Sequence, residues 1–209
     1  VDSFPAHEID DFLIIAALGG GTGSGGAPVI ARKIQKIYNE PVFGLGILPS
    51  PEEGSIYSLN AARSFQTFVH EVDNLLVFDN DSWRQSGESL EHGYDRLNEE
   101  LINRFGTLFS AGEVHDPNNV AESVVDASEI INTLKEGGVT TVGYASEEIQ
   151  SSSSGFLDSL RGKSEPVDST TATNRITSLV RKASLGRLTL PCDISSSERA
   201  LVVVAGPTQ

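Results

Sequence analysis

The sequence is poor in cysteine and lacks a long apolar run, and each shortage excludes a class of protein. Its 209 residues contain one cysteine, Cys192, so no internal disulfide can form and no cysteine pair suggests a structural zinc site. Apolar runs stay below the roughly 18 residues of a membrane-spanning helix, and no signal-peptide pattern is present. We therefore expect a cytoplasmic location without direct membrane insertion, and Cys192 as a small apolar core residue.

Basic residues are also scarce. The chain has 15 lysines and arginines against 29 acidic residues, a formal net charge of −14, and only five of the basic residues are lysines. Such a surface repels nucleic acid and anionic lipid, so we expect neither as a partner. One interpretation is a solvated acidic surface that aids solubility. A more specific one is adaptation to high salt, in which screening removes the mutual repulsion of the carboxylates.

Glycine, in contrast, is concentrated in one segment. Residues 19–25 read Gly-Gly-Gly-Thr-Gly-Ser-Gly, directly after the apolar run 12–18 and before the helical apolar spacing of residues 27–38. A backbone with so little side-chain bulk can curl tightly and point several N–H groups at one anion. At a helix N-terminus the dipole also favours a phosphate. The segment therefore predicts a phosphate-binding turn.

Two other interpretations of this segment are open. The glycines can serve only to pack a helix closely on a sheet. Residues 21–26 also satisfy G-x-G-x-x-G, the fingerprint of dinucleotide-binding enzymes, which expects an acidic residue about 20 positions on. Glu52 and Glu53 follow somewhat later than that. An NAD(P)-dependent oxidoreductase is accordingly an alternative function.

Strand-like and helix-like patterns alternate in the first part of the chain. Strands are predicted near 12–18, 42–48 and 75–78, and helices near 25–38 and 56–72. This alternation predicts an α/β fold with a parallel sheet that helices cover on both faces. Ligands of such sheets bind at the carboxyl ends of the strands. The loops expected to meet at that edge are residues 19–25, 49–54 and 79–81.

The second half of the chain is organised differently. A long amphipathic helix is predicted over 88–110, and a loop rich in turn residues follows at 115–119. We place a domain boundary after residue 111, so that residues 1–111 form half of a nucleotide-binding domain and residues 112–209 a smaller α+β domain. The elements expected in the second domain are helices at 120–135 and 172–183, strands at 139–145 and 200–205, and a mobile Ser/Gly-rich surface insertion at 150–170.

The glycine segment matches, letter for letter, the G-G-G-T-G-[ST]-G signature of the tubulin/FtsZ superfamily. Residues 49–54, 77–81 and 94–98 resemble, in the family's order, its ribose loop, the segment before its central helix, and the guanine-reading part of that helix. With its acidic composition, the chain is most similar to the archaeal CetZ group of tubulin-like proteins. The resemblance implies a parallel-sheet GTPase domain joined by a long central helix to a smaller α+β domain. It also implies that the sequence is the middle of a longer protein.

The resemblance further implies GTP or GDP as the ligand. Because no lysine accompanies the glycines, backbone dipoles and Mg²⁺ would have to neutralise the phosphate charge. Glu53 is placed at the ribose, Asn80 and Asn98 at the guanine edge, and Tyr94 in a stack with the base. The alternatives are a helix-dipole charge for Glu53, a helix cap for Asn80 and a solvated position for Asn98. The implied phosphate-binding residues are Gly19, Gly20, Gly21, Thr22, Gly23, Ser24 and Gly25.

Glu122 and Asp126 are the implied catalytic pair. They are four residues apart in a predicted helix, so their carboxylates project from one face. In the resembled family this region enters the nucleotide site of the next subunit along a head-to-tail filament, where carboxylates orient the attacking water. The resemblance thus implies a self-associating cytoskeletal GTPase with a role in cell shape or division. The alternatives are an acidic first-turn residue for Glu122 and a tubulin-like regulator that binds nucleotide without turnover.

Overall fold

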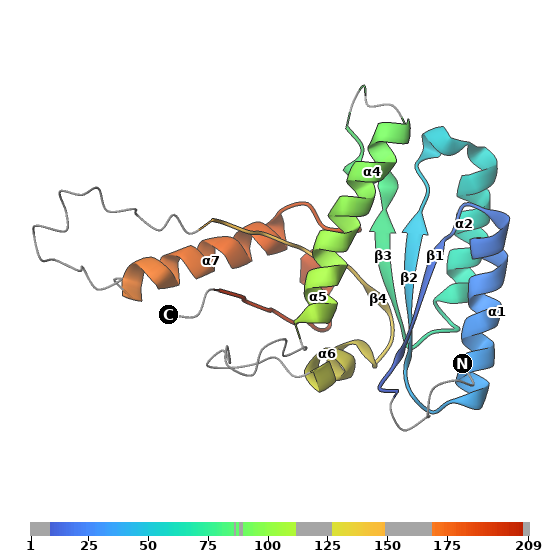
Figure 1. Ribbon diagram of the computed structural model, residues 1–209, viewed down its shortest axis with the longest axis horizontal. Coiled ribbons are helices and arrows are strands. Elements are labelled where there is room, and N and C mark those ends of the chain that lie inside the picture. Colours follow the sequence, from blue (N-terminus) through green and yellow to red (C-terminus); the bar gives the residue numbers. More distant parts are fainter. Residues whose placement is uncertain (1–8, 86, 88–89, 112–126, 149–168, 207–209) are drawn as a thin grey trace, which may run out of the picture. The chain divides into compact units, whose positions relative to one another are not determined.

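A four-stranded parallel sheet organises the fold (Figure 1). The computed structural model describes residues 9–85, 87, 90–111, 127–148 and 169–206. The strands lie in the order β1-β2-β3-β4, and every neighbouring pair is parallel. The predicted α/β fold with a parallel sheet is therefore confirmed. The bounds of the strands are β1 Phe12–Ala17, β2 Val42–Leu48, β3 Asn74–Asp79 and β4 Val139–Thr140.

Helices cover both faces of this sheet. Helices α1 and α2 lie on one face and α4 on the other (Figure 1). The long helix predicted over residues 88–110 is present as α4, a π-helical segment at Ile102–Gly106, and α5. The bounds of the helices are α1 Gly21–Ile37, α2 Ser55–Phe68, α3 Asn80–Trp83, α4 Leu90–Leu101, α5 Thr107–Ser110 and α6 Ala127–Leu134.

The two faces of β3 belong to two hydrophobic cores, because successive side chains of a strand point in opposite directions. Leu75 and Val77 pack on the side of α1 and α2. Leu76 and Phe78 pack on the side of α4. All four side chains are fully buried, which accounts for the continuous apolar run of this strand. The cores fix the carboxyl ends of β1, β2 and β3 at one edge of the sheet.

The residues from 127 onward follow the predicted second domain only in part. The expected strand at 139–145 is limited to β4, which extends the sheet beyond β3. Residues 143–188 form a compact unit of their own, which contains helix α7, Ser169–Leu185. The strand predicted at 200–205 is wrong, because the described residues there pair with no other strand, and a β-strand needs such a partner for its backbone hydrogen bonds. The domain division after residue 111 stays a prediction, and most of the predicted insertion lies outside the described residues.

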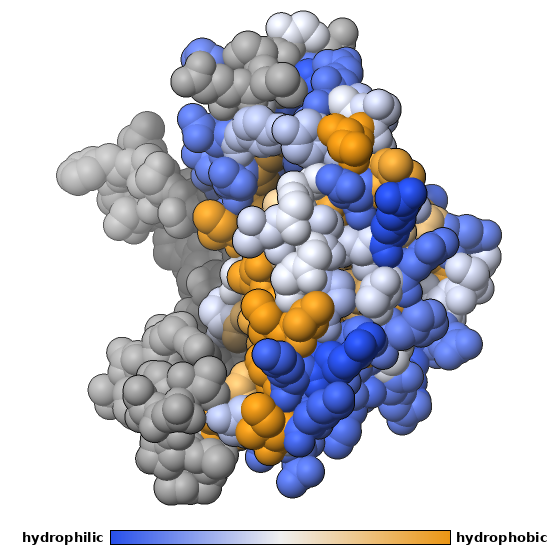
Figure 2. Space-filling model, turned by 90° about the vertical axis from the view of Figure 1, so that its right-hand side faces the viewer, coloured by the Kyte–Doolittle hydropathy of each residue, from blue (hydrophilic) through white to orange (hydrophobic). Residues whose placement is uncertain are grey.

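The surface on the side of α1 is mixed in character. Hydrophobic patches interrupt the hydrophilic surface in this view (Figure 2). In the part of the chain that the structure describes, no helix is both long and apolar enough to cross a membrane. The exposed apolar side chains of α1 and α2 include Val29, Ile30, Ile37, Ile56 and Leu59.

Cys192 lies at the surface, so its expected place in the core is wrong. The neighbouring Ile194 is 39% exposed, which shows that apolar side chains in this segment do not by themselves indicate a core.

Candidate nucleotide-binding site

Helix α1 begins within the glycine segment, at an earlier residue than the sequence predicted. Helix α1 starts at Gly21 rather than near residue 25, with Gly20 as an extended N-cap that offers no side-chain cap. Its first intrahelical hydrogen bond runs from the Ser24 amide to the Gly20 carbonyl over 3.0 Å. The amides of Gly21, Thr22 and Gly23 therefore have no intrahelical acceptor. This end of α1 can donate several N–H groups to an anion.

Two kinds of glycine make up the segment. A Cβ on Gly23 would lie 2.0 Å from the carbonyl oxygen of Ala17, and one on Gly19 would lie 3.2 Å from Cβ of Pro49. These two glycines allow close packing of the chain, as one of the alternatives proposed. A Cβ on Gly20, Gly21 or Gly25 would meet nothing within 4 Å. Their small size is not needed for packing, and it leaves open space beside the amides.

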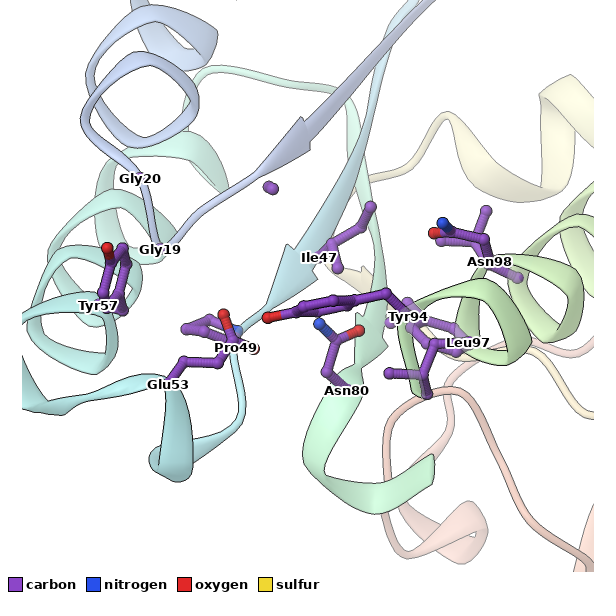
Figure 3. Close-up of a pocket in the computed structure, with 13 residues that line it drawn as sticks. Gly19, Gly20, Ile47, Pro49, Glu53, Tyr57, Asn80, Tyr94, Leu97 and Asn98 are labelled. Carbon is purple, nitrogen blue, oxygen red and sulfur yellow. The ribbon is translucent and has the colours of Figure 1, made fainter. Parts of the chain in front are cut away.

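A pocket of about 300 Å³ opens beside this helix start (Figure 3). It is formed at the carboxyl ends of β1, β2 and β3, where the sequence predicted a ligand site, and by one side of α4. The structure thus brings together loops that are far apart in the sequence. The predicted site residues that line the pocket are Gly19, Gly20, Glu53, Asn80, Tyr94 and Asn98.

Other predicted site residues lie outside the pocket lining. They are the first five residues of α1, next to the lining residue Gly20: Gly21, Thr22, Gly23, Ser24 and Gly25. The Ser24 hydroxyl donates to the Gly21 carbonyl at 3.5 Å, so it is turned toward its own helix. The predicted catalytic residues Glu122 and Asp126 fall outside the described residues.

Glu53 is held in place by its own turn. It ends a short 3₁₀ helix, Pro51–Glu53, and its Oε1 accepts the Ser50 amide at 2.8 Å. Ser50 is fully buried, and its hydroxyl donates to Asp81 at 2.9 Å, which connects the turn after β2 to helix α3 directly after β3. Gly54 follows with φ of +123°, a backbone conformation that favours glycine. The Glu53 carboxylate is therefore fixed at the wall of the pocket.

Tyr94 reaches across the pocket from α4 toward Glu53 (Figure 3). Burial raises the pKa of the Tyr94 phenol, and the charge and hydrogen bonding of Glu53 raise it further. The phenol is thus kept protonated and can act as a donor to the carboxylate.

The two asparagines lie on different elements. Asn80 is the first residue of α3 and is 8% exposed, with its side chain toward the Tyr94 ring (Figure 3). The capping role considered for Asn80 belongs instead to Asp79, whose side chain accepts the Asp81 amide. Asn98 follows Tyr94 by one helical turn; it is solvent-exposed and also lines the pocket. An amide offers both a donor and an acceptor, which suits the edge of a heterocyclic base.

The apolar lining was not predicted. Ile47 and Phe78 lie near the carboxyl ends of β2 and β3. Their positions at the ends of predicted strands were the sequence signal that could have identified them as pocket residues. Tyr57, from the first turn of α2, also lines the pocket. Among the described residues that line it, there is one carboxylate, Glu53, and no lysine or arginine. A phosphate would therefore depend on backbone amides and a bound cation. Among the described residues, no group of three or more His, Cys, Asp and Glu side chains is placed to hold a metal.

Comparison with known proteins identifies two matching families. The tubulin/FtsZ family GTPase domain matches residues 5–88. The C-terminal domain of tubulin-like CetZ matches residues 87–209. The curated relatives include tubulin-like protein CetZ1 of Haloferax volcanii, which is 65% identical over 215 residues, covering all of this chain and 54% of that protein. The chain thus spans about half the length of the curated relatives it matches.

Solved structures agree with this assignment. The GDP-bound monomer of CetZ1 from Haloferax volcanii has a TM-score of 0.74 and 60% identity, and the match covers 91% of this chain and 48% of that one. CetZ2 from the same organism, solved as a GTPγS-bound protofilament, has a TM-score of 0.70 and 40% identity over 88% of this chain and 48% of that one.

Proposed function

This chain belongs to the CetZ-type tubulin-like proteins of the tubulin/FtsZ family, and we propose that its pocket binds a guanine nucleotide. One observation carries the proposal: the N-terminus of α1, with its free amides, opens at the same pocket as Glu53, Asn80 and Asn98. The pocket therefore combines groups suited to phosphates, to a sugar and to a base.

The phosphates would lie against the first turn of α1. Gly20 and Gly21 leave space for close approach, and the amides of residues 21–23 supply donors. Because the described residues that line the pocket include no basic side chain, we propose that Mg²⁺ bound to the phosphates supplies the remaining positive charge.

The sugar and base would lie toward α4. The fixed carboxylate of Glu53 can accept hydrogen bonds from ribose hydroxyls. Asn80 and Asn98 would read the guanine edge, and the Tyr94 ring would contact the base. Family membership favours this GTPase interpretation over the dinucleotide-binding alternative for residues 21–26.

We also propose that the whole protein hydrolyses GTP and assembles head-to-tail. The support is the family membership and the protofilament of CetZ2, a relative 40% identical in sequence. Glu122 and Asp126 would then complete the site of the adjacent subunit and orient the attacking water. Contacts of this heterologous kind propagate as a filament, so hydrolysis would depend on assembly.

The test is a set of binding and turnover measurements on the whole protein in concentrated KCl with Mg²⁺. We expect GTP to bind and NAD⁺ not to, and the GTPase rate per molecule to rise steeply with protein concentration. Glu122→Ala should slow hydrolysis and leave GTP affinity intact. Binding of GTP without turnover would support the regulator alternative, and absence of guanine-nucleotide binding would overturn the proposal.

Base recognition has its own test. Asn98→Asp should shift preference from GTP toward xanthosine triphosphate by about tenfold or more, since a carboxylate reverses the hydrogen-bonding pattern at the base edge. Asn103→Asp is the matched control, because Asn103 is an exposed asparagine later in the same long helix and does not line the pocket. An unchanged preference in Asn98→Asp would remove this residue from the base site.

A further inference from the structure

Tyr94 and Glu53 face each other across the proposed nucleotide site. The two side chains come from different elements, α4 and the turn after β2, and both line the pocket. The Tyr94 ring extends across the pocket, so that its hydroxyl faces the Glu53 side chain (Figure 3). Glu53 is also the carboxylate that would receive the ribose.

The two partners differ in how firmly they are held. Glu53 accepts the Ser50 amide at 2.8 Å, and Ser50 is itself fully buried and bonded to Asp81. Tyr94, in contrast, is 39% exposed. A change in this contact would therefore move the tyrosine rather than the carboxylate.

Phenol and ribose offer the carboxylate the same chemistry. The Tyr94 hydroxyl is a hydrogen-bond donor, as are the 2′- and 3′-hydroxyls of a ribose, and each gains most from an ionised acceptor. One carboxylate oxygen of Glu53 already accepts the Ser50 amide, and the Tyr94 hydroxyl faces the same carboxylate, so a ribose hydroxyl would have to enter the space that the phenol occupies. Binding of a ribose through Glu53 would therefore displace the Tyr94 hydroxyl from the carboxylate that it faces.

We propose that the Tyr94 hydroxyl competes with the ribose hydroxyls for Glu53, which makes Tyr94 a determinant of nucleotide affinity and sugar preference. This inference rests on the proposed nucleotide-binding function. The ring and the hydroxyl then have opposite effects: the ring adds apolar contact with the base, whereas the hydroxyl must leave the carboxylate before the sugar can take its place.

The test compares Tyr94→Phe with the original protein, each titrated with GDP and with 2′,3′-dideoxy-GDP in concentrated KCl and Mg²⁺. Phenylalanine keeps the ring and removes only the competing donor. We expect Tyr94→Phe to bind GDP about threefold to tenfold more tightly, the range expected for the net contribution of one ordinary hydrogen bond. Affinity for the dideoxy nucleotide, which lacks both donors, should change by less than about twofold.

Two further variants separate this effect from general changes in the protein. Tyr38→Phe removes a phenol hydroxyl outside the pocket and should alter neither affinity. In a Glu53→Ala background, Tyr94→Phe should no longer tighten GDP binding, because the contested acceptor is gone.

Each remaining outcome would overturn the inference. An equal gain for both nucleotides would show a packing effect of the phenylalanine. A loss confined to GDP would mean that the Tyr94 hydroxyl binds the sugar directly. If the original protein bound neither nucleotide, the proposed function itself would fail, and this result differs from binding that is insensitive to Tyr94.

Discussion

The guanidinium carbon of Arg104 lies 3.9 Å from the centroid of the Trp83 ring, so that a buried cation covers an aromatic face. Trp83 in turn stacks on Phe78, which lines the pocket, with 5.9 Å between the ring centroids. Arg104 also forms an ion pair with Glu100, one helical turn earlier. These contacts connect the wall of the pocket to the π-helical segment of the long helix.

Replacing Arg104 with Met should destabilise the fold. Methionine replaces the apolar stem of the arginine, but the change removes the cation–π contact and leaves Glu100 without this partner, a loss of about 1–2 kcal/mol. Thermal denaturation should show a decrease in Tm of roughly 2–8 °C. The emission of Trp83, the single tryptophan, should also change.

Arg63→Met is the control for this prediction, because Arg63 is an exposed arginine on α2. Its Tm and tryptophan emission should match those of the original protein. Equal effects of the two substitutions would contradict a specific role for the Trp83 contact.

Gly23 and Gly21 should respond differently to alanine. Gly23→Ala would place a methyl group 2.0 Å from the Ala17 carbonyl oxygen, so it should cost about 1–3 kcal/mol of stability through overpacking. Gly21→Ala meets no protein atom within 4 Å and should leave Tm almost unchanged. It should nevertheless weaken GTP binding by about tenfold or more, since the methyl group enters space next to the phosphate-binding amides. Melting curves and GTP titrations of both variants test this, and wild-type affinity in Gly21→Ala would contradict it.

Asp11 should make the fold less stable as pH rises. Burial raises its pKa from the ordinary value of 3.8, and the nearby charge of Asp10 raises it further. In the unfolded chain this carboxyl ionises first, so the folded state loses stability as pH rises from about 3.8 through the raised pKa. Asp11→Asn should remove this decrease. Urea denaturation of both proteins from about pH 3 to 6 measures the free energy of unfolding at each pH. Parallel pH profiles of the two proteins would contradict the prediction.

Salt should stabilise the protein. With a formal charge of −14, carboxylates repel one another across the surface, and at about 1 M salt the Debye length falls to roughly 3 Å. We expect Tm to rise by about 10 °C or more between dilute buffer and concentrated KCl. Asp95 and Glu99 are exposed like charges four residues apart on α4, so Asp95→Asn combined with Glu99→Gln should reduce the salt requirement. Salt-independent melting would contradict adaptation to high salt.

Local patterns predicted the sheet well and the helix start poorly. The strands at 12–18, 42–48 and 75–78 were found because continuous apolar runs bounded by turn residues are typical of buried parallel strands. The glycines at 21–25 have low helix propensity, so the pattern placed them in a loop. In the structure they begin α1, because Gly23 packs directly against Ala17 and this tertiary contact outweighs the propensity.

The chain's sequence determined the parallel α/β architecture and the glycine-rich segment after β1, since both follow from residue order within short segments. It also indicated Glu53, Asn80, Tyr94 and Asn98 through resemblance to a known family. Only the tertiary structure decided that these side chains share one pocket and that Tyr94 faces Glu53 within it. Such contacts depend on the distance between the strand ends and α4. Core packing sets this distance, and no local sequence pattern encodes it.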